Sequence, residues 1–276
     1  MAALLSSVNP VRISRSLWHY HSLIVELVKR ELSQRYRGSF LGVLWTFIVP
    51  LFMLSIYTFV FGVVFKARWQ VNGPETPTGE FALILYAGLT PFNLFSEVAN
   101  RSPSLIVNMT NYVKRVVFPL EILPVVTVGA ALVNSLINVG LLIIANLLIT
   151  HTFSLALVFL PLAYIPLLLF CLGVSWFLAS LGVYIRDIAQ GIVIAVQILF
   201  FLTPIVYPIT SVPAGLQPVL AVNPLTFIAD SFRQAVLWNQ ELHWKALLAW
   251  TLVMGLFALL GYAWFMKTRK GFADVL

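Results

Sequence analysis

Long uncharged stretches alternate with short charged clusters along this chain. The first stretch covers residues 38–65 and has basic residues on both sides: Lys29, Arg30, Arg35 and Arg37 before it, and Lys66 and Arg68 after it. A bilayer core about 30 Å thick requires roughly 20 apolar residues of helix, so this stretch is long enough to cross it. Backbone polar groups in lipid must be satisfied within the segment, and we therefore expect the crossing to be helical. The cation excess before it predicts a cytoplasmic N-terminus.

The same pattern predicts five further spans. No Asp, Glu, Lys or Arg occurs from Ile122 to Ile185, a stretch too long for one crossing. The polar cluster His151–Ser154 lies near its middle and predicts a turn between two spans. Asn134 and Asn138 share one face of the first of these spans, where amides in lipid are expected to hydrogen-bond to a neighbouring helix. The five spans are predicted over residues 81–99, 119–149, 155–181, 188–207 and 245–266.

Three segments lie outside the predicted spans. Residues 14–37 mix apolar and charged side chains at helical spacing, which is typical of an amphipathic helix in the membrane interface; a soluble helix packed on a partner is the alternative. Residues 102–114 predict a short cytoplasmic helix. Residues 209–243 are half apolar and repeatedly broken, which favours a pair of short re-entrant helices. We therefore predict an all-α polytopic membrane protein, with six transmembrane helices in a single domain over residues 1–276.

Composition agrees with this fold class. The chain is 60% hydrophobic and only 10% charged, with a mean hydropathy of +0.94, whereas soluble domains contain about 25% charged residues. The net charge of +7 does not indicate nucleic-acid binding, because the placement of the charges follows the predicted topology. Both termini are expected in the cytoplasm. Of the 17 lysines and arginines, all lie in predicted cytoplasmic segments except Lys66, Arg68, Arg233 and Lys245.

The sequence gives little indication of a catalytic site or a metal site. The single cysteine, Cys171, excludes an internal disulfide and a zinc cluster built on thiolates. The four histidines are scattered, and none has a second ligand at metal spacing, so no metal site is predicted. The chain lacks the pattern GxxxxGK[ST] and so has no such loop to hold a nucleotide phosphate. A membrane enzyme, such as a glycan acyltransferase, remains an alternative that would require converging histidines or carboxylates.

Two predicted spans carry aromatic rings beside polar groups. On an ideal helix, Phe40, Phe47 and Phe61 fall on one side of the first span with Tyr57 beside them, and Trp45 falls opposite. Sugars present C–H faces that stack on rings and hydroxyls that need hydrogen-bonding partners. Amides in an apolar span are costly unless they face partners or water. Ordinary helix packing is the alternative for any single ring. The predicted substrate-channel residues are Phe40, Phe47, Tyr57, Phe61, Gln190, Gln197, Phe201 and Tyr207.

Several sequence blocks resemble those of a known family. KRELSQRYRGSFLGVLWTFIVPL at 29–51 is similar to the N-terminal signature of the permease subunits of ABC-type polysaccharide exporters, which export O-antigen, capsular polysaccharide or teichoic acid. Further blocks fit in the same order over nearly the whole chain. They are YVKRVVFPLEILP at 112–124, YIRDIAQ at 184–190, LTPIVYP at 202–208, NPLTFIADSFRQAVL at 223–237 and KGFADVL at 270–276.

The resemblance implies a transport subunit that is not an enzyme. Two copies pair as a homodimer around a channel in the bacterial inner (cytoplasmic) membrane, and the substrate is a lipid-linked polysaccharide. Two separate ABC ATPase subunits bind ATP and Mg²⁺, so no cofactor is expected in this chain. Residues 209–243 form an outer gate. The ATPase subunits dock on residues 102–114, and the residues expected to make this coupling contact are Ser104, Asn108, Asn111, Tyr112 and Lys114.

Two features of the sequence allow two interpretations each. Arg35 and Arg37 are candidates to hold the pyrophosphate of the lipid carrier through charge-assisted hydrogen bonds; alternatively, they only anchor the helix by the positive-inside rule. A permease for drugs or small lipids is an alternative to a polysaccharide exporter.

Overall fold

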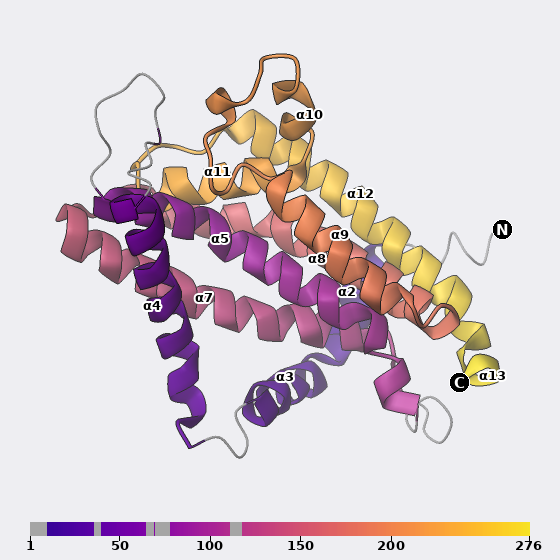
Figure 1. Cartoon of the computed structure of the whole chain (residues 1–276). Coiled ribbons are helices and arrows are strands. Elements are labelled where there is room, and N and C mark those ends of the chain that lie inside the picture. The colour runs from indigo at the N-terminus through magenta and orange to yellow at the C-terminus, as the bar shows by residue number, and fades with distance from the viewer. Residues whose placement is uncertain (1–9, 36–39, 65–68, 70–77, 111–117) are drawn as a thin grey trace.

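The computed structural model describes residues 10–35, 40–64, 69, 78–110 and 118–276, and all of the regular elements in these ranges are helices (Figure 1). Two shorter apolar helices, Trp45–Phe61 and Ile188–Phe201, occupy the predicted first and fifth spans. The all-helical fold is confirmed, while the count of six crossings remains a prediction. Four helices are long and apolar enough to cross a membrane by length and composition: Gly79–Ser104, Ile122–Thr150, Leu155–Tyr184 and Trp244–Val275.

The predicted turn between the third and fourth spans is present. Helix α7 (Ile122–Thr150) ends where His151 adopts a left-handed conformation with φ of 53°, and its N–H bonds to the carbonyl of Leu147. Such a residue satisfies an otherwise free carbonyl in the last turn and stops the helix. The chain then continues through the 3-10 turn η5 (Leu155–Phe159) into α8 (Leu160–Tyr184).

The first and fifth spans are less regular than the others. A 3-10 turn, η1 (Gly42–Leu44), leads into α4 (Trp45–Tyr57), and a π-helical segment, η2 (Thr58–Val64), follows. Helix α9 (Ile188–Phe201) ends before the predicted limit of residue 207. Thr203 precedes Pro204, and a residue before proline is disfavoured in a helical conformation. At 1.5 Å per residue, α9 is about 21 Å long, which is less than the bilayer core.

The segments outside the spans are also divided into short elements. The predicted interfacial helix over residues 14–37 consists of two helices that meet at Tyr20, and the predicted helix over 102–114 starts with two 3-10 turns; residues 111–117 lie outside the described part. In residues 209–243 the longest helix is α11. The bounds are α2 (Pro10–His19), α3 (His21–Arg35), η3 (Ser102–Ser104), η4 (Val107–Met109), η6 (Ile209–Ser211), α10 (Gln217–Ala221) and α11 (Pro224–Val236).

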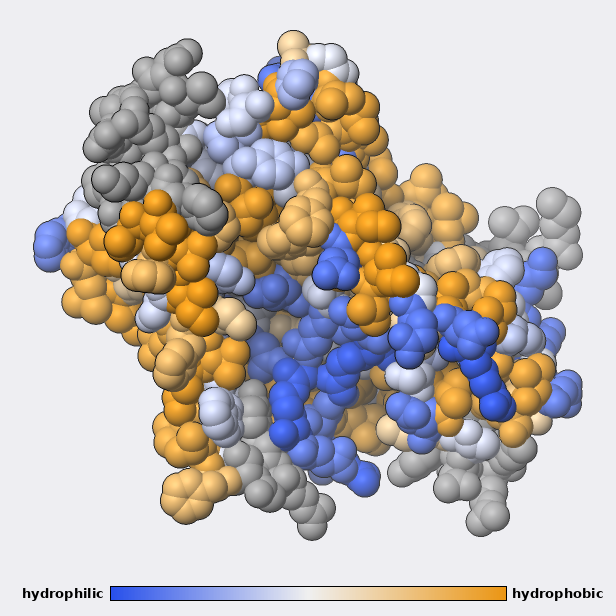
Figure 2. All heavy atoms as spheres, in the orientation of Figure 1, coloured by the Kyte–Doolittle hydropathy of each residue, from blue (hydrophilic) through white to orange (hydrophobic). Residues whose placement is uncertain are grey.

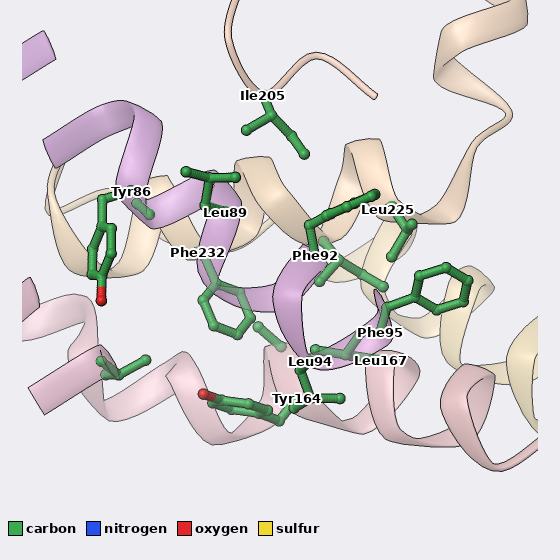
Figure 3. Packing of buried hydrophobic residues seen from close by; sticks show 14 of the residues in the cluster. Tyr86, Leu89, Phe92, Leu94, Phe95, Tyr164, Leu167, Ile205, Leu225 and Phe232 are labelled. Atoms are coloured by element: carbon green, nitrogen blue, oxygen red, sulfur yellow. The ribbon is translucent and has the colours of Figure 1, made fainter. Parts of the chain in front are cut away.

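Helix α5 (Thr78–Arg101) forms the centre of the fold and is buried along most of its length. It contributes Tyr86, Leu89 and Phe92 to the main hydrophobic core, which also includes side chains of α8 and α11 (Figure 3). The rings of Tyr164 on α8 and Phe232 on α11 pack edge to face at 4.9 Å. A helix that is apolar on all sides is expected to be enclosed by others. Asn134 and Asn138 on α7 are turned toward this helix.

Small residues bring α8, α12 (Trp244–Thr268) and η3 into close contact. A Cβ atom on Gly261 of α12 would lie 2.4 Å from the carbonyl oxygen of Gly173 on α8. A Cβ atom on Gly182 of α8 would lie 2.0 Å from the carbonyl oxygen of Pro103 in η3. Only glycine permits such backbone approach. These three elements therefore form one tightly packed unit that includes the start of the predicted coupling segment.

The C-terminal tail packs against the same unit. After the 3-10 turn η7 (Arg269–Gly271), the short helix α13 (Phe272–Val275) begins with the fully buried ring of Phe272. Arg269 pairs with Glu121, just before α7, with 2.6 Å between the two side chains. The tail thus joins residues 118–121, just before α7, to the end of α12.

Candidate functional site

A cluster of charged side chains joins α3 to the end of α5. Glu97 on α5 accepts hydrogen bonds from Arg35 on α3 and from Asn134 on α7, the latter at 3.3 Å. Arg101 lies 2.7 Å from Glu31 and 3.4 Å from Glu97. Figure 2 shows hydrophilic surface gathered over this region, in a recess between the apolar surfaces of α4 and α9. We call these five side chains the charged cluster.

The environment of the charged cluster changes the acidity of one member. Burial raises the pKa of Glu31 above its ordinary value of 4.5, and the positive charges of Arg101 and Arg35 oppose that shift. The Glu31 side chain is 17% exposed, so its carboxylate is partly removed from water. Desolvation disfavours the charged form of a carboxyl group, and here it outweighs the attraction.

A cavity of about 820 Å³ lies beside the charged cluster. Lys29 and Arg30 of α3 line one part of it, and Asn108, Arg101 and the first turns of α7 line another. The cavity therefore combines cationic groups from the predicted interfacial helix with a residue of the predicted coupling segment.

The two asparagines of α7 make the interhelical hydrogen bonds that their spacing predicts. Asn134 donates to Glu97, as described above, and Tyr86 of α5 donates its hydroxyl to Oδ1 of Asn138 at 2.6 Å. The prediction of a neighbouring-helix partner for both amides is confirmed.

The predicted channel residues of the first span divide into two groups. Phe40 and Phe47 are exposed on the described surface, by 103% and 40%. Tyr57 and Phe61 are half-buried; the Phe61 ring packs against Phe81 of α5 with centroids 6.0 Å apart. The structure therefore exposes the N-terminal part of this face, with Phe40 and Phe47, and packs the C-terminal part, with Phe61, against α5.

The predicted channel residues of the fifth span are mostly open. Gln190, Gln197 and Phe201 are exposed on α9, and neither amide hydrogen-bonds to another described residue. Tyr207 is half-buried and donates its hydroxyl to the carbonyl of Phe201 at 2.7 Å. Within one chain α4 and α9 flank α5 from different sides (Figure 1), so the two faces border the recess rather than contact each other.

Other predicted site residues are only partly described. Arg35 pairs with Glu97 in the charged cluster. Ser104 is half-buried and donates to the carbonyl of Arg101 at 3.1 Å, and Asn108 is exposed. The predictions for Arg37, Asn111, Tyr112 and Lys114 fall on residues outside the described part.

Sequence reasoning did not identify Glu31, Glu97 or Arg101 as site residues. Each lies at or near the predicted end of a helix, where a charge is ordinary. Only the packing of α3 on α7, beside the end of α5, brings them together. No group of three or more His, Cys, Asp or Glu side chains is placed to hold a metal ion in the ranges that the structure describes.

These features define the class of a polytopic helical membrane protein with a polar recess between apolar helices. The chain belongs to the ABC-2 type transporter family, which it matches over residues 22–237. It is 30% identical over 234 residues to a protein named O-antigen export system permease protein RfbA from Myxococcus xanthus, covering 84% of this chain and 86% of that protein.

Two further relatives extend the similarity. An O-antigen export system permease protein RfbA from Klebsiella pneumoniae is 24% identical over 267 residues, which is 96% of this chain and 99% of that protein. A polysialic acid transport protein KpsM from Escherichia coli is 26% identical over 236 residues, which is 82% of this chain and 85% of that protein. The resemblance to permease subunits of polysaccharide exporters is confirmed at the level of the family.

Proposed function

We propose that this chain is the membrane-spanning permease subunit of an ATP-driven exporter that moves a lipid-linked polysaccharide, such as O-antigen, across the bacterial inner membrane. Its family and the names of the three relatives support this substrate class. Two separate ABC ATPase subunits bind and hydrolyse ATP with Mg²⁺, and this chain needs no cofactor of its own. It makes six crossings, with both termini in the cytoplasm.

The single observation that carries the proposal is the exposure of Gln190 and Gln197 on an otherwise apolar helix. Two amides facing lipid are unfavourable, whereas amides facing a water-filled path are not. A second copy of the chain, placed with its α4 and α9 toward the recess in Figure 2, encloses these amides. Rings from α4 then provide stacking surfaces for sugar, and the amides provide hydrogen-bonding groups.

Force from the ATPase subunits enters through residues 102–114. Ser104 and Asn108 lie in the described part of this segment, and Asn111, Tyr112 and Lys114 complete the proposed contact. Because η3 packs directly on α8 at Gly182, a displacement of the segment moves the tightly packed unit of η3, α8 and α12. The α9 helix follows α8 after a short turn at Arg186 and Asp187, so it moves with this unit. Residues 209–243 act as the outer gate.

The lipid carrier enters beside α3. Arg35 and Arg37, at the end of this helix, hold its pyrophosphate by charge-assisted hydrogen bonds. The neighbouring cavity of about 820 Å³ is lined by three cations, Lys29, Arg30 and Arg101, and by two carboxylates, Glu26 and Glu31. This excess of positive charge supports an anionic ligand on this side. When the carrier binds, Arg35 leaves its ion pair with Glu97 and binds the pyrophosphate instead.

The test is export in a strain that lacks the chromosomal copy of this gene. Replacing Gln190 and Gln197 together by leucine removes two hydrogen bonds of about 1 kcal/mol each, and we expect export to fall by roughly tenfold or more. Surface polysaccharide and lipid-linked glycan retained inside are measured together with the amount of inserted protein. The matched control is Ile194→Leu, at an exposed apolar position of the same helix, which removes no amide and should export normally.

Two results would refute the proposal. The first is normal surface polysaccharide in the strain without this gene. The second is normal export by the double leucine variant at normal protein levels, which would remove the channel role of α9. Increased sensitivity to drugs with unchanged polysaccharide would favour the permease for drugs or small lipids.

A further inference from the structure

The most buried cation in the described part of the chain is Arg233 on α11. Its side chain is 1% exposed, and it is one of the four cations that the predicted topology places outside the cytoplasmic segments. A charged side chain inside a membrane protein is costly unless partners surround it. The location and partners of Arg233 therefore require an explanation that the positive-inside pattern does not supply.

The guanidinium of Arg233 connects three separate segments. Its Nε donates to the carbonyl of Ile84 on α5 at 3.1 Å. Its Nη2 donates to the carbonyls of Pro204 and Ile205, after the end of α9, both at 3.0 Å. Its Nη1 lies 2.7 Å from the carboxylate of Asp230, one turn earlier on α11. The planar fork of arginine provides these donors in fixed directions, which the single ammonium of lysine does not.

Two further contacts fix the position of the guanidinium. Trp69, in the connection between the predicted first and second spans, lies with its ring centroid 4.4 Å from Cζ of Arg233. Gly88 on α5 leaves the space that the guanidinium occupies, because a Cβ atom there would lie 2.4 Å from Nη2. The side chain thus has packing partners on both α5 and the outer connection.

The acceptors on the α9 side are carbonyls of non-helical backbone. Such backbone at membrane depth is tolerated only where protein or water satisfies it. Since Pro204 cannot extend α9, no helical N–H donates to the carbonyls of Pro204 and Ile205. The guanidinium of Arg233 donates to both carbonyls instead. Losing this guanidinium frees the end of α9 from both α5 and α11.

We propose that Arg233 is a positioning residue that holds the outer gate closed in the resting transporter. It fixes α11, which lies in residues 209–243, and the end of α9 to α5. Gate opening then requires these carbonyls to leave the guanidinium. The inference rests on the proposed function only in taking residues 209–243 as the gate.

The experiment measures passive ion flux. Full-length chain is reconstituted in liposomes with its ATPase subunits, and potassium efflux is recorded without ATP and without glycan. Arg233→Lys keeps the charge but loses the fork, and Gly88→Ala displaces the guanidinium from the α5 side. Losing one charge-assisted hydrogen bond shifts a closed-to-open equilibrium by about tenfold or more, so we expect efflux at least about tenfold above wild type in both variants.

Matched substitutions control for insertion and packing. Arg186→Lys changes an exposed arginine between α8 and α9, and Gly140→Ala changes a glycine of α7 with no atom within 4 Å of the added Cβ; both should show wild-type efflux. Damage that is merely structural lowers the amount of reconstituted protein or its unfolding midpoint and does not create flux. If Arg233→Lys fails to insert, the result with Gly88→Ala decides.

Wild-type efflux in an inserted Arg233→Lys or Gly88→Ala variant would overturn the proposal. The measurement uses neither polysaccharide nor ATP, so it is independent of the substrate class. A wild-type complex that fails to export polysaccharide would refute the proposed function and leave the comparison of fluxes intact.

Discussion

At the scale of single residues, Glu97 is the acceptor on which the charged cluster depends. Replacing it by glutamine removes the carboxylate that Arg35 and Arg101 share. The side chains of Arg35 and Glu97 are 28% and 22% exposed, so we expect a loss smaller than for a fully buried pair, about 1–2 kcal/mol of unfolding free energy. The thermal midpoint in detergent measures it. Glu241→Gln, in an exposed connection, is the control, and equal midpoints for the two variants would contradict the prediction.

Glu31 gives the charged cluster a pH dependence. Because burial raises the pKa of Glu31 in the folded protein, the folded state binds this proton more tightly than the unfolded state does. Protonation of Glu31 therefore adds to the free energy of unfolding. This contribution is fully present below the ordinary pKa of 4.5 and is lost as the pH rises through the raised pKa of the folded protein. The Glu31→Gln variant has no titratable group at this position and serves as the reference.

We therefore expect the midpoint of the wild type, relative to that of Glu31→Gln, to be highest in acid and to fall toward neutral pH. Thermal unfolding of both proteins over this range measures the difference. A difference that increases with pH would mean that attraction by Arg101 dominates over burial.

Individual polar residues show what spacing along the sequence can and cannot predict. Asn134 and Asn138 lie one turn apart in an apolar span, and that pattern alone predicts partners on another helix. The partner of Arg101 was not predictable, because Glu31 lies in a different helix whose packing depends on the whole fold. The burial of Arg233 was not predictable either, because the carbonyls and the ring that surround its guanidinium belong to other segments of the chain.

At the scale of elements, the contact between η3 and α8 depends on Gly182. A Cβ atom there would lie 2.0 Å from a backbone oxygen of Pro103, and backbone cannot move aside as a flexible side chain can. We expect Gly182→Ala to cost about 1–3 kcal/mol of unfolding free energy, as overpacking does. It should also reduce export more than it reduces ATP hydrolysis, because the proposed coupling passes through this contact.

Gly140→Ala is the matched substitution within a helix, since the added Cβ meets no atom within 4 Å. It should raise stability by about 0.5–1 kcal/mol through helix propensity. Thermal midpoints and the ratio of glycan exported to ATP hydrolysed distinguish the two variants. Unchanged values for Gly182→Ala would show that η3 and α8 separate without cost.

Apolar length predicted the helical elements well where a helix is uninterrupted. The turn at His151 follows from the one polar cluster in a long uncharged stretch. The first and fifth spans were less predictable, because a π-helical segment at Thr58–Val64 and a helix end at Phe201 depend on local backbone geometry and on proline. The division of residues 14–37 at Tyr20 had no signal in the hydrophobic pattern.

At the scale of the whole molecule, the proposed homodimer predicts what covers the recess between α4 and α9 (Figure 2). The apolar residues of α12 and the amides of α9 are both exposed in one copy of the chain. Leu248 on α12 is 63% exposed, and its chemistry suits lipid. The amides suit a partner or water, so the proposed homodimer predicts different surroundings for the two helices.

Cysteine labelling tests this difference directly. Cys171 is the single cysteine and is fully buried, so a Cys171→Ala background leaves no other thiol. We expect Gln197→Cys to react with a water-soluble maleimide, because it faces the channel, and Leu248→Cys to remain unmodified, because lipid covers it. Labelling is read by mass shift in sealed membranes with the ATPase subunits present. Protection of position 197 equal to that of position 248 would place both helices in lipid and remove the channel from α9.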